Sequence, residues 1–200
     1  MNKKQVVLIG DSIRMGYQET VARQLADIAD VWGPTENGAH TVNVLVNLHQ
    51  WVFNRQPAPD LVHINAGLHD LKTIWYGGQQ SVVPVEHYRH NVETILRTIR
   101  ERTKAKVIWA MTTPVIYERA HANHAQYRDF DRYDEYVVSY NLVAAQVCKR
   151  LGVPVNDLFA AVTVAGKETL LNQDGVHFTP AGYELLGATV AGKIREALQA

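Results

Sequence analysis

Val6-Val7-Leu8-Ile9-Gly10-Asp11-Ser12 joins an apolar, β-branched run to a glycine, an acid and a serine. A run of this kind predicts a strand that is buried on both faces, as the strands of parallel sheets are. A helical pattern follows the serine along the chain. This order of strand, turn and helix predicts an α/β fold in which Ser12 lies just beyond the carboxyl end of the first strand.

Similar apolar runs predict further strands. The longer runs cover residues 61–64 and 106–111, and the shorter ones cover 30–32 and 153–155. Between them, apolar residues at three- and four-residue spacing predict helices over 17–29, 41–54, 85–102, 136–151 and 180–198. The alternation predicts a five-stranded parallel sheet covered on both faces, which is a three-layer α/β/α sandwich. Because ligands of such sheets bind at the carboxyl ends of the strands, we expect chemistry just after residues 9, 64 and 111.

The length and the charge of the chain limit its function. The chain has 200 residues, which fits a single domain over residues 1–200. Lysine and arginine together number 20, as do aspartate and glutamate, so the balance indicates no basic surface for nucleic acid. We therefore expect a small-molecule partner and neither nucleic acid nor a membrane. The oligomeric state is left open.

Other classes of site are excluded by what the sequence lacks. Cys148 is the single cysteine, so a disulfide framework is impossible. We find no dinucleotide, Walker A or zinc-protease motif, and His121 and His124 have no third ligand at a recognisable spacing. We therefore expect no cofactor and no metal. No segment has the length of a membrane span or of a signal peptide's apolar region, so we expect a cytoplasmic location.

Ser12 is the first candidate for chemistry. Its place at a strand-to-helix turn exposes the hydroxyl at the edge of the sheet, and backbone N–H groups at a helix start can stabilise negative charge on a substrate oxygen. The alternative interpretation is that Asp11 or Ser12 only caps the helix.

Asp174-Gly175-Val176-His177 is the second candidate, and it lies just before the helical pattern that starts at Pro180. An aspartate three residues before a histidine can contact Nδ1 of the ring, which leaves Nε2 to take a proton from a serine. The alternative is a surface turn followed by a Thr179 helix cap.

Four blocks of the sequence, taken in order, resemble those of the SGNH hydrolases, also called the GDSL family. They are Gly10-Asp11-Ser12, Asn37-Gly38-Ala39, Gly67-Leu68-His69-Asp70 and Asp174-x-x-His177. The resemblance spans nearly the whole chain. It implies a flavodoxin-like sandwich with the strand order 2-1-3-4-5.

The resemblance also implies roles for particular residues. Ser12 is expected to be the nucleophile, His177 its base and Asp174 the residue that orients the histidine. The N–H groups of Ser12 and Gly38 are expected to belong to the oxyanion hole, the group of donors that stabilises the negatively charged oxygen of the intermediate.

The third block departs from the family pattern at His69, where the family has an asparagine whose amide donates to the oxyanion. An imidazole N–H can also donate, so we expect His69 to take part in the oxyanion hole. The alternatives are that Asn65 donates instead, that His69 is a structural histidine, or that the enzyme is slow on ordinary esters.

Three more residues are candidates for the wall of the substrate pocket, namely Arg14, Asn65 and Thr113. Arg14 can pair with an anionic substrate group, although we favour a structural or surface ion pair for it. Residues 117–135 are crowded with charged side chains. For this segment we favour a solvated loop with an exposed helical turn over a lid that shapes the substrate site.

Together these features predict a serine esterase or acylhydrolase that works through an acyl-enzyme. Neither the acyl group nor the alcohol is identified by the sequence, and a short acyl group on a small molecule or a sugar is our expectation. Two alternatives stay open. One is a binding protein that kept the fold but lost efficient oxyanion stabilisation at His69, and the other is an acyltransferase that uses a sugar hydroxyl in place of water.

Overall fold

The main sheet contains five parallel strands. A computed structural model of the protein describes residues 3–76, 78–127 and 129–200. The strands are β1 (Lys4–Ile9), β2 (Ala29–Trp32), β3 (Leu61–Asn65), β5 (Lys106–Ala110) and β7 (Val155–Asn156). They lie in the order β2-β1-β3-β5-β7, which among these strands is 2-1-3-4-5 and confirms the predicted topology.

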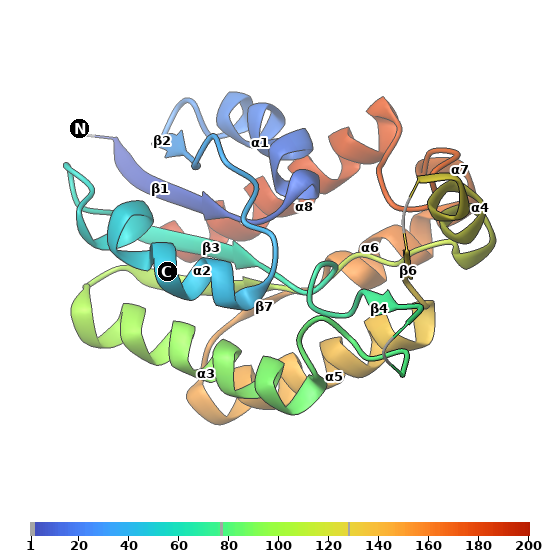
Figure 1. Ribbon diagram of the computed structural model, residues 1–200. Coiled ribbons are helices and arrows are strands. Elements are labelled where there is room, and N and C mark those ends of the chain that lie inside the picture. Colours follow the sequence, from blue (N-terminus) through green and yellow to red (C-terminus); the bar gives the residue numbers. More distant parts are fainter. Residues whose placement is uncertain (1–2, 77, 128) are drawn as a thin grey trace.

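Helices cover both faces of this sheet (Figure 1). On one face α1 (Ser12–Gln24) packs against α8 (Pro180–Gln199), which also contacts α6 (Leu158–Ala165). On the other face α3 (Val85–Arg102) packs between α2 (Thr41–Leu48) and α5 (Asp134–Leu151). The three-layer α/β/α sandwich is thus confirmed. Within the described ranges, no helix is both long and apolar enough to cross a membrane.

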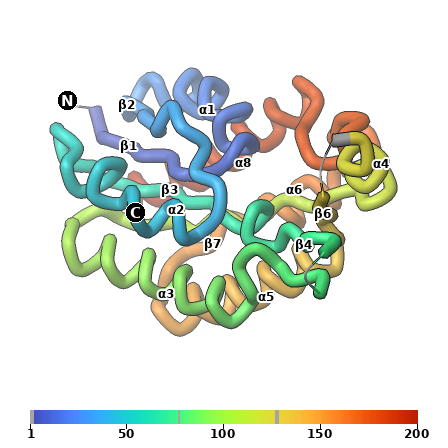
Figure 2. The backbone as a smooth tube through the Cα atoms, viewed as in Figure 1, coloured from blue at the N-terminus to red at the C-terminus, as the bar shows by residue number. Residues whose placement is uncertain are grey.

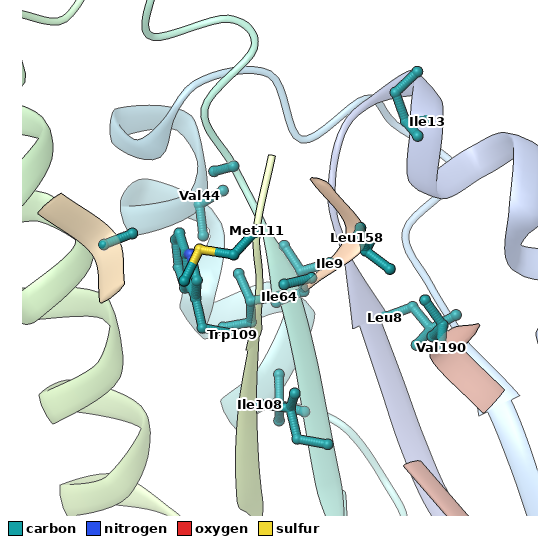
Figure 3. Packing of buried hydrophobic residues seen from close by; sticks show 14 of the residues in the cluster. Leu8, Ile9, Ile13, Val44, Ile64, Ile108, Trp109, Met111, Leu158 and Val190 are labelled. Carbon is teal, nitrogen blue, oxygen red and sulfur yellow. The ribbon is translucent and has the colours of Figure 1, made fainter. Parts of the chain in front are cut away.

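The core lies on both sides of the sheet, as expected for parallel strands. Figure 3 shows Leu8 of β1 toward Val190 of α8, and Trp109 of β5 on the side of Val44 of α2. All four side chains are fully buried. This packing holds the strands rigidly and therefore fixes the loops at their carboxyl ends.

Some helix boundaries differ from the prediction. α1 begins at Ser12 and not at residue 17, because the Asp11 carboxylate caps the helix by accepting the N–H of Ile13 at 2.9 Å. The buried Arg14 interrupts the apolar pattern of this first turn. The predicted helix over 41–54 ends as a short π-helix, η1 (His49–Phe53). Neither α6 nor α7 (Lys167–Leu170) was predicted.

A small additional layer lies beyond the carboxyl ends of the strands. It consists of β4 (Thr73–Ile74), α4 (Tyr117–Tyr127) and β6 (Phe130–Asp131), and we call these elements the cap. β4 and β6 pair antiparallel although they are far apart in the sequence. Figure 2 shows the cap at the end of the molecule opposite the N-terminus.

Specific contacts fasten the cap together. The Asp131 carboxylate accepts the indole N–H of Trp75 at 2.7 Å and lies 3.0 Å from Nδ1 of His121. Tyr117 stacks on Tyr133 with ring centroids 4.9 Å apart. Asp131 is only 2% exposed. The expectation of a solvated loop with an exposed helical turn over residues 117–135 is therefore wrong in part: α4 is helical and largely exposed, but Asp131 and Arg132 are buried. Arg128 lies outside the described residues.

Candidate active site

Ser12 and His177 meet at the carboxyl edge of the sheet. Ser12 is the first residue of α1, directly after the turn that ends β1, and His177 lies in the loop before α8. The Oγ atom of Ser12 lies 2.8 Å from Nε2 of His177, which is hydrogen-bonding distance. The two residues are 165 positions apart in the chain, so only the fold brings this hydroxyl and this imidazole together.

Asp174 holds the other side of the imidazole. One carboxylate oxygen lies 2.7 Å from Nδ1 of His177, and the other accepts the N–H groups of Val176 and His177. Burial opposes ionisation of Asp174, but these hydrogen bonds outweigh it and lower the pKa of the carboxyl. Asp174 is therefore an anion that fixes the ring with its Nδ1 protonated and with Nε2 as the acceptor.

Gly175 permits the tight turn between these two residues. Its φ of +67° lies in the left-handed region, and a Cβ atom there would be 2.4 Å from the carbonyl oxygen of Ile116. The carbonyl of Gly175 accepts the N–H of Ile116 at 2.9 Å. The Asp174–His177 turn is thereby attached to the start of the segment that leads into the cap.

The Gly38 loop differs from the expectation drawn from the resemblance. The N–H of Gly38 donates to the carbonyl of Gly10 at 2.9 Å, so in this geometry it is not a free oxyanion donor. A Cβ atom at Gly38 would lie 2.6 Å from that carbonyl oxygen, so only glycine allows the loop to approach the end of β1. Ser12 is different: as the first residue of α1, it has an N–H without an acceptor inside the helix.

The expected pocket residues Arg14, Asn65 and Thr113 do not line the site. Arg14 is 1% exposed, and its guanidinium donates to the side chain of Gln18 and to the carbonyl of Glu36. The Asn65 amide donates to the carbonyl of Ala110 at 3.0 Å and so links the ends of β3 and β5. Thr113 is buried as well, at 2% exposure. None of these three residues lines the cavity beside Ser12.

A cavity of about 540 Å³ opens beside Ser12 and His177. The remaining residues of its wall are Asn37, Leu68, His69, Lys72, Asn123, His124, Phe130, Arg132 and Val176. Four of these, Asn123, His124, Phe130 and Arg132, come from α4, β6 and the residue after it. The cap therefore forms one side of the site, which agrees with the less favoured interpretation of residues 117–135 as a segment that shapes the substrate site. The charge-rich stretch after residue 117 was its only signal.

His69 lines the same cavity as the Ser12–His177 pair, as expected. Burial, together with the nearby cations Lys72 and Arg132, lowers the pKa of His69 to about 3. The ring is therefore neutral near pH 7 and has one N–H to donate.

Replacement of His69 by alanine is expected to lower kcat on an ester by about 100-fold, the usual cost of losing one oxyanion donor. Asparagine at this position has the amide typical of the family and is expected to restore part of the rate. His87→Ala, on the exposed surface of α3, is the matched control. Steady-state kinetics of the three variants measure the effect, and a kcat unchanged in His69→Ala would remove His69 from the oxyanion hole.

Asp70 braces the loop that carries His69. Its carboxylate accepts the N–H and the hydroxyl of Thr41 at 3.0 and 2.5 Å, and the Thr41 hydroxyl in turn accepts the amide of Asn91 at 2.9 Å. Burial raises the pKa of Asp70 to about 7, although the hydrogen bonds from Thr41 act in the opposite direction.

This raised pKa predicts how stability depends on pH. Because the folded protein holds the Asp70 proton more tightly than the unfolded chain does, the free energy of unfolding falls as pH rises from about 4 to about 7. The full contribution is at most about 4 kcal/mol. Asp70→Asn has no proton to lose, so its stability relative to the wild type is expected to increase over this interval. Urea unfolding at several pH values tests this, and a constant difference would contradict it.

Comparison with known proteins identifies the family of the chain. The sequence model of the GDSL-like Lipase/Acylhydrolase family matches residues 8–185, most of the chain. The chain belongs to this family. The matched residues include both the serine block after β1 and the Asp174–His177 turn, which confirms the family resemblance found in the sequence.

Individual relatives of this GDSL-family protein support the same assignment. The chain is 24% identical to the GDSL esterase/lipase CPRD49 of Arabidopsis thaliana, over 98% of this chain and 80% of that protein. The lipase/acylhydrolase from Enterococcus faecalis has a TM-score of 0.79 at 28% identity and covers 97% of this chain and 96% of its own. This GDSL-family protein is an ester-hydrolysing enzyme.

A more distant structure shows the shared fold alone. Axe2, an acetylxylan esterase from Geobacillus stearothermophilus, has a TM-score of 0.72 at 17% identity. The similarity covers 96% of this chain and 94% of that chain.

Proposed function

We propose that the protein is a serine esterase that cleaves a short acyl group from a small molecule or a sugar through an acyl-enzyme. The observation that carries this proposal is the hydrogen-bonded series from Asp174 through His177 to Ser12, with distances of 2.7 and 2.8 Å. A nucleophile, a base and a carboxylate that orients the base are the components of this type of catalysis.

In the first half of the reaction, Nε2 of His177 takes the proton of Ser12 while Oγ attacks the carbonyl carbon of the ester. The N–H of Ser12 and the ring N–H of His69 stabilise the negative charge that forms on the carbonyl oxygen. The intermediate then expels the alcohol, which takes its proton from His177. Ser12 is left acylated.

In the second half, a water molecule gives a proton to His177 and attacks the acyl-enzyme carbonyl. The second intermediate expels Oγ of Ser12, which recovers its proton from His177, and the carboxylic acid leaves. Asp174 stays ionised in both halves and stabilises the imidazolium that forms each time.

The size and the lining of the cavity support a small, polar substrate. Leu68, Phe130 and Val176 are the apolar side chains of its wall, and the other eight lining residues are polar or charged. A long acyl chain would need a longer apolar surface. The acetylxylan substrate of the Geobacillus relative, an acetylated sugar, is an example of the polar ester class that this cavity suits.

The proposal is tested by measuring hydrolysis of acetyl, butyryl and longer p-nitrophenyl esters, together with acetylated sugars. We expect a pre-steady-state burst of p-nitrophenol from acyl-enzyme formation and a decline in kcat/KM as the acyl chain lengthens. Formation of an acylated sugar without free acid would show transfer in place of hydrolysis, and a preference for long chains would contradict the short acyl group.

A further inference from the structure

Arg132 is a buried cation whose hydrogen-bond partners are neutral. Its Nε donates to the carbonyl of Leu68 at 2.8 Å, and Nη1 lies 3.2 Å from Nε2 of His124. The residue is 6% exposed, yet it lines the cavity beside Ser12. Among residues 3–76, 78–127 and 129–200, no carboxylate forms an ion pair with it. A buried charge without an ionic partner is costly, so this guanidinium favours an anionic ligand.

Lys72 adds a second positive charge to the same wall. Its Nζ lies 4.6 Å from the centroid of the Phe130 ring, and the guanidinium carbon of Arg132 lies 5.1 Å from the same centroid. Both cations therefore lie beside the Phe130 ring, on the side of the cavity that the cap forms.

The acidic groups near this wall are engaged elsewhere, although burial lowers the pKa of Arg132 to about 10 while the charges of Asp11 and Asp174 act in the opposite direction. None of the described residues that line the cavity is an aspartate or a glutamate. The oxygens of Asp174 contact His177 and two backbone N–H groups. Asp11 is fully buried at the N-terminus of α1. Burial and the two cations lower the pKa of His69 to about 3, and burial and Arg132 lower that of His124 to about 4, so both rings are neutral near pH 7. The wall therefore carries the charges of Arg132 and Lys72.

We propose that Arg132 and Lys72 bind a negatively charged group, a carboxylate or a phosphate, of the ester substrate while Ser12 attacks its acyl carbonyl. The guanidinium fork suits the geometry of an oxyanion group, and the ammonium adds a compact charge beside it. This inference rests on the proposed esterase function and specifies its substrate class: esters whose acyl or alcohol part is anionic.

Two pairs of esters test the charge on each side of the scissile bond. Monoethyl succinate and ethyl butyrate differ by a carboxylate on the acyl side, and 4-acetoxybenzoate and 4-acetoxybenzamide differ on the alcohol side. In at least one pair, we expect kcat/KM to be about 10-fold or more higher for the anionic ester. This preference is expected to decline as the salt concentration rises.

Variants assign the preference to the two side chains. Lys72→Gln is expected to reduce the ratio of anionic to neutral kcat/KM by about 10-fold, mainly through a higher KM for the anionic ester. Lys149→Gln, on the exposed surface of α5, is the matched control. Arg132→Gln is expected to reduce the ratio as well, and Arg132→Lys to retain part of it. If Arg132→Gln does not fold, the Lys72→Gln ratio and the salt dependence still test whether the site prefers anionic esters.

Equal turnover of both esters in each pair, or a ratio that Lys72→Gln leaves unchanged, would overturn the anionic substrate class. Failure of all four esters would contradict the esterase proposal instead. The two failures are separated by titrating all four esters into the Ser12→Ala protein and following side-chain NMR shifts. We expect saturable shifts with the anionic member of at least one pair and not with its neutral partner, and equal responses within both pairs would overturn the anion site.

Discussion

Replacement of Ser12 by alanine is expected to lower kcat on its best ester by about 10,000-fold or more. Without Oγ the covalent intermediate cannot form, and the donors that remain around the carbonyl oxygen supply only a residual acceleration. The hydroxyl is not needed for folding, because Asp11 is the residue that caps α1. The thermal midpoint of the variant is therefore expected to stay close to that of the wild type, and calorimetry with steady-state kinetics measures both quantities.

Ser139→Ala is the matched control for this prediction. Ser139 is exposed on α5, where its hydroxyl donates to the carbonyl of Glu135. Its loss is expected to leave kcat unchanged. If Ser12→Ala kept a tenth or more of the wild-type kcat with the same substrate, another group would have to be the nucleophile.

Replacement of Asp174 by asparagine is expected to lower kcat by about 10,000-fold with little change in KM. The amide can still accept the N–H groups of Val176 and His177, so the turn is retained. Its NH₂ group, however, would favour the His177 tautomer in which Nδ1 is the acceptor and Nε2 carries the proton. In that tautomer the ring cannot take the proton of Ser12, and an imidazolium would lose its stabilising charge.

The control for the second variant is Asp157→Asn. Asp157 caps α6 by accepting the N–H of Ala160 at 2.9 Å, and asparagine is an equally good cap, so kcat and stability should both stay unchanged. A tenfold or smaller reduction of kcat in Asp174→Asn would show that another group orients His177.

The main helices and strands and the Asp174–His177 turn were predictable because each depends on residues that are close together in the sequence. The helix predicted over 85–102 coincides with α3, whose buried Val92, Ile95, Leu96 and Ile99 recur at helical spacing. β1 and β3 are short, buried, apolar runs rich in β-branched residues, a pattern that is typical of a strand. Asp174 and His177 are three residues apart, so their contact depends on a single turn.

The cap could not be predicted in the same way. β4 and β6 each have two residues, too few to show any period, and they pair across a long stretch of chain. Arg132 looks like a surface residue in the sequence, and its burial depends on the carbonyl of Leu68 and on His124 reaching it. Side chains that line the cavity from the cap are therefore set by tertiary contacts and have no local sequence signal.

The residues expected in the oxyanion hole could be predicted only in part. His69 was expected in the site from its block, and it does line the cavity. For Gly38, the resemblance implied an N–H in the oxyanion hole, but this N–H donates to the carbonyl of Gly10, to which the loop closely approaches. Arg14 shows the reverse, since its proximity to Ser12 in the sequence suggested a pocket residue while its side chain is buried away from the cavity.

The most direct test of Ser12 as the nucleophile is labelling of the folded protein with a fluorophosphonate, followed by intact mass measurement and peptide mapping. A serine activated by His177 attacks the phosphorus and keeps the adduct, whereas ordinary serines do not react at a comparable rate. We predict one adduct per chain, located on Ser12 and absent from Ser12→Ala and from the unfolded protein. An unlabelled folded protein, or an adduct on another residue, would contradict the account.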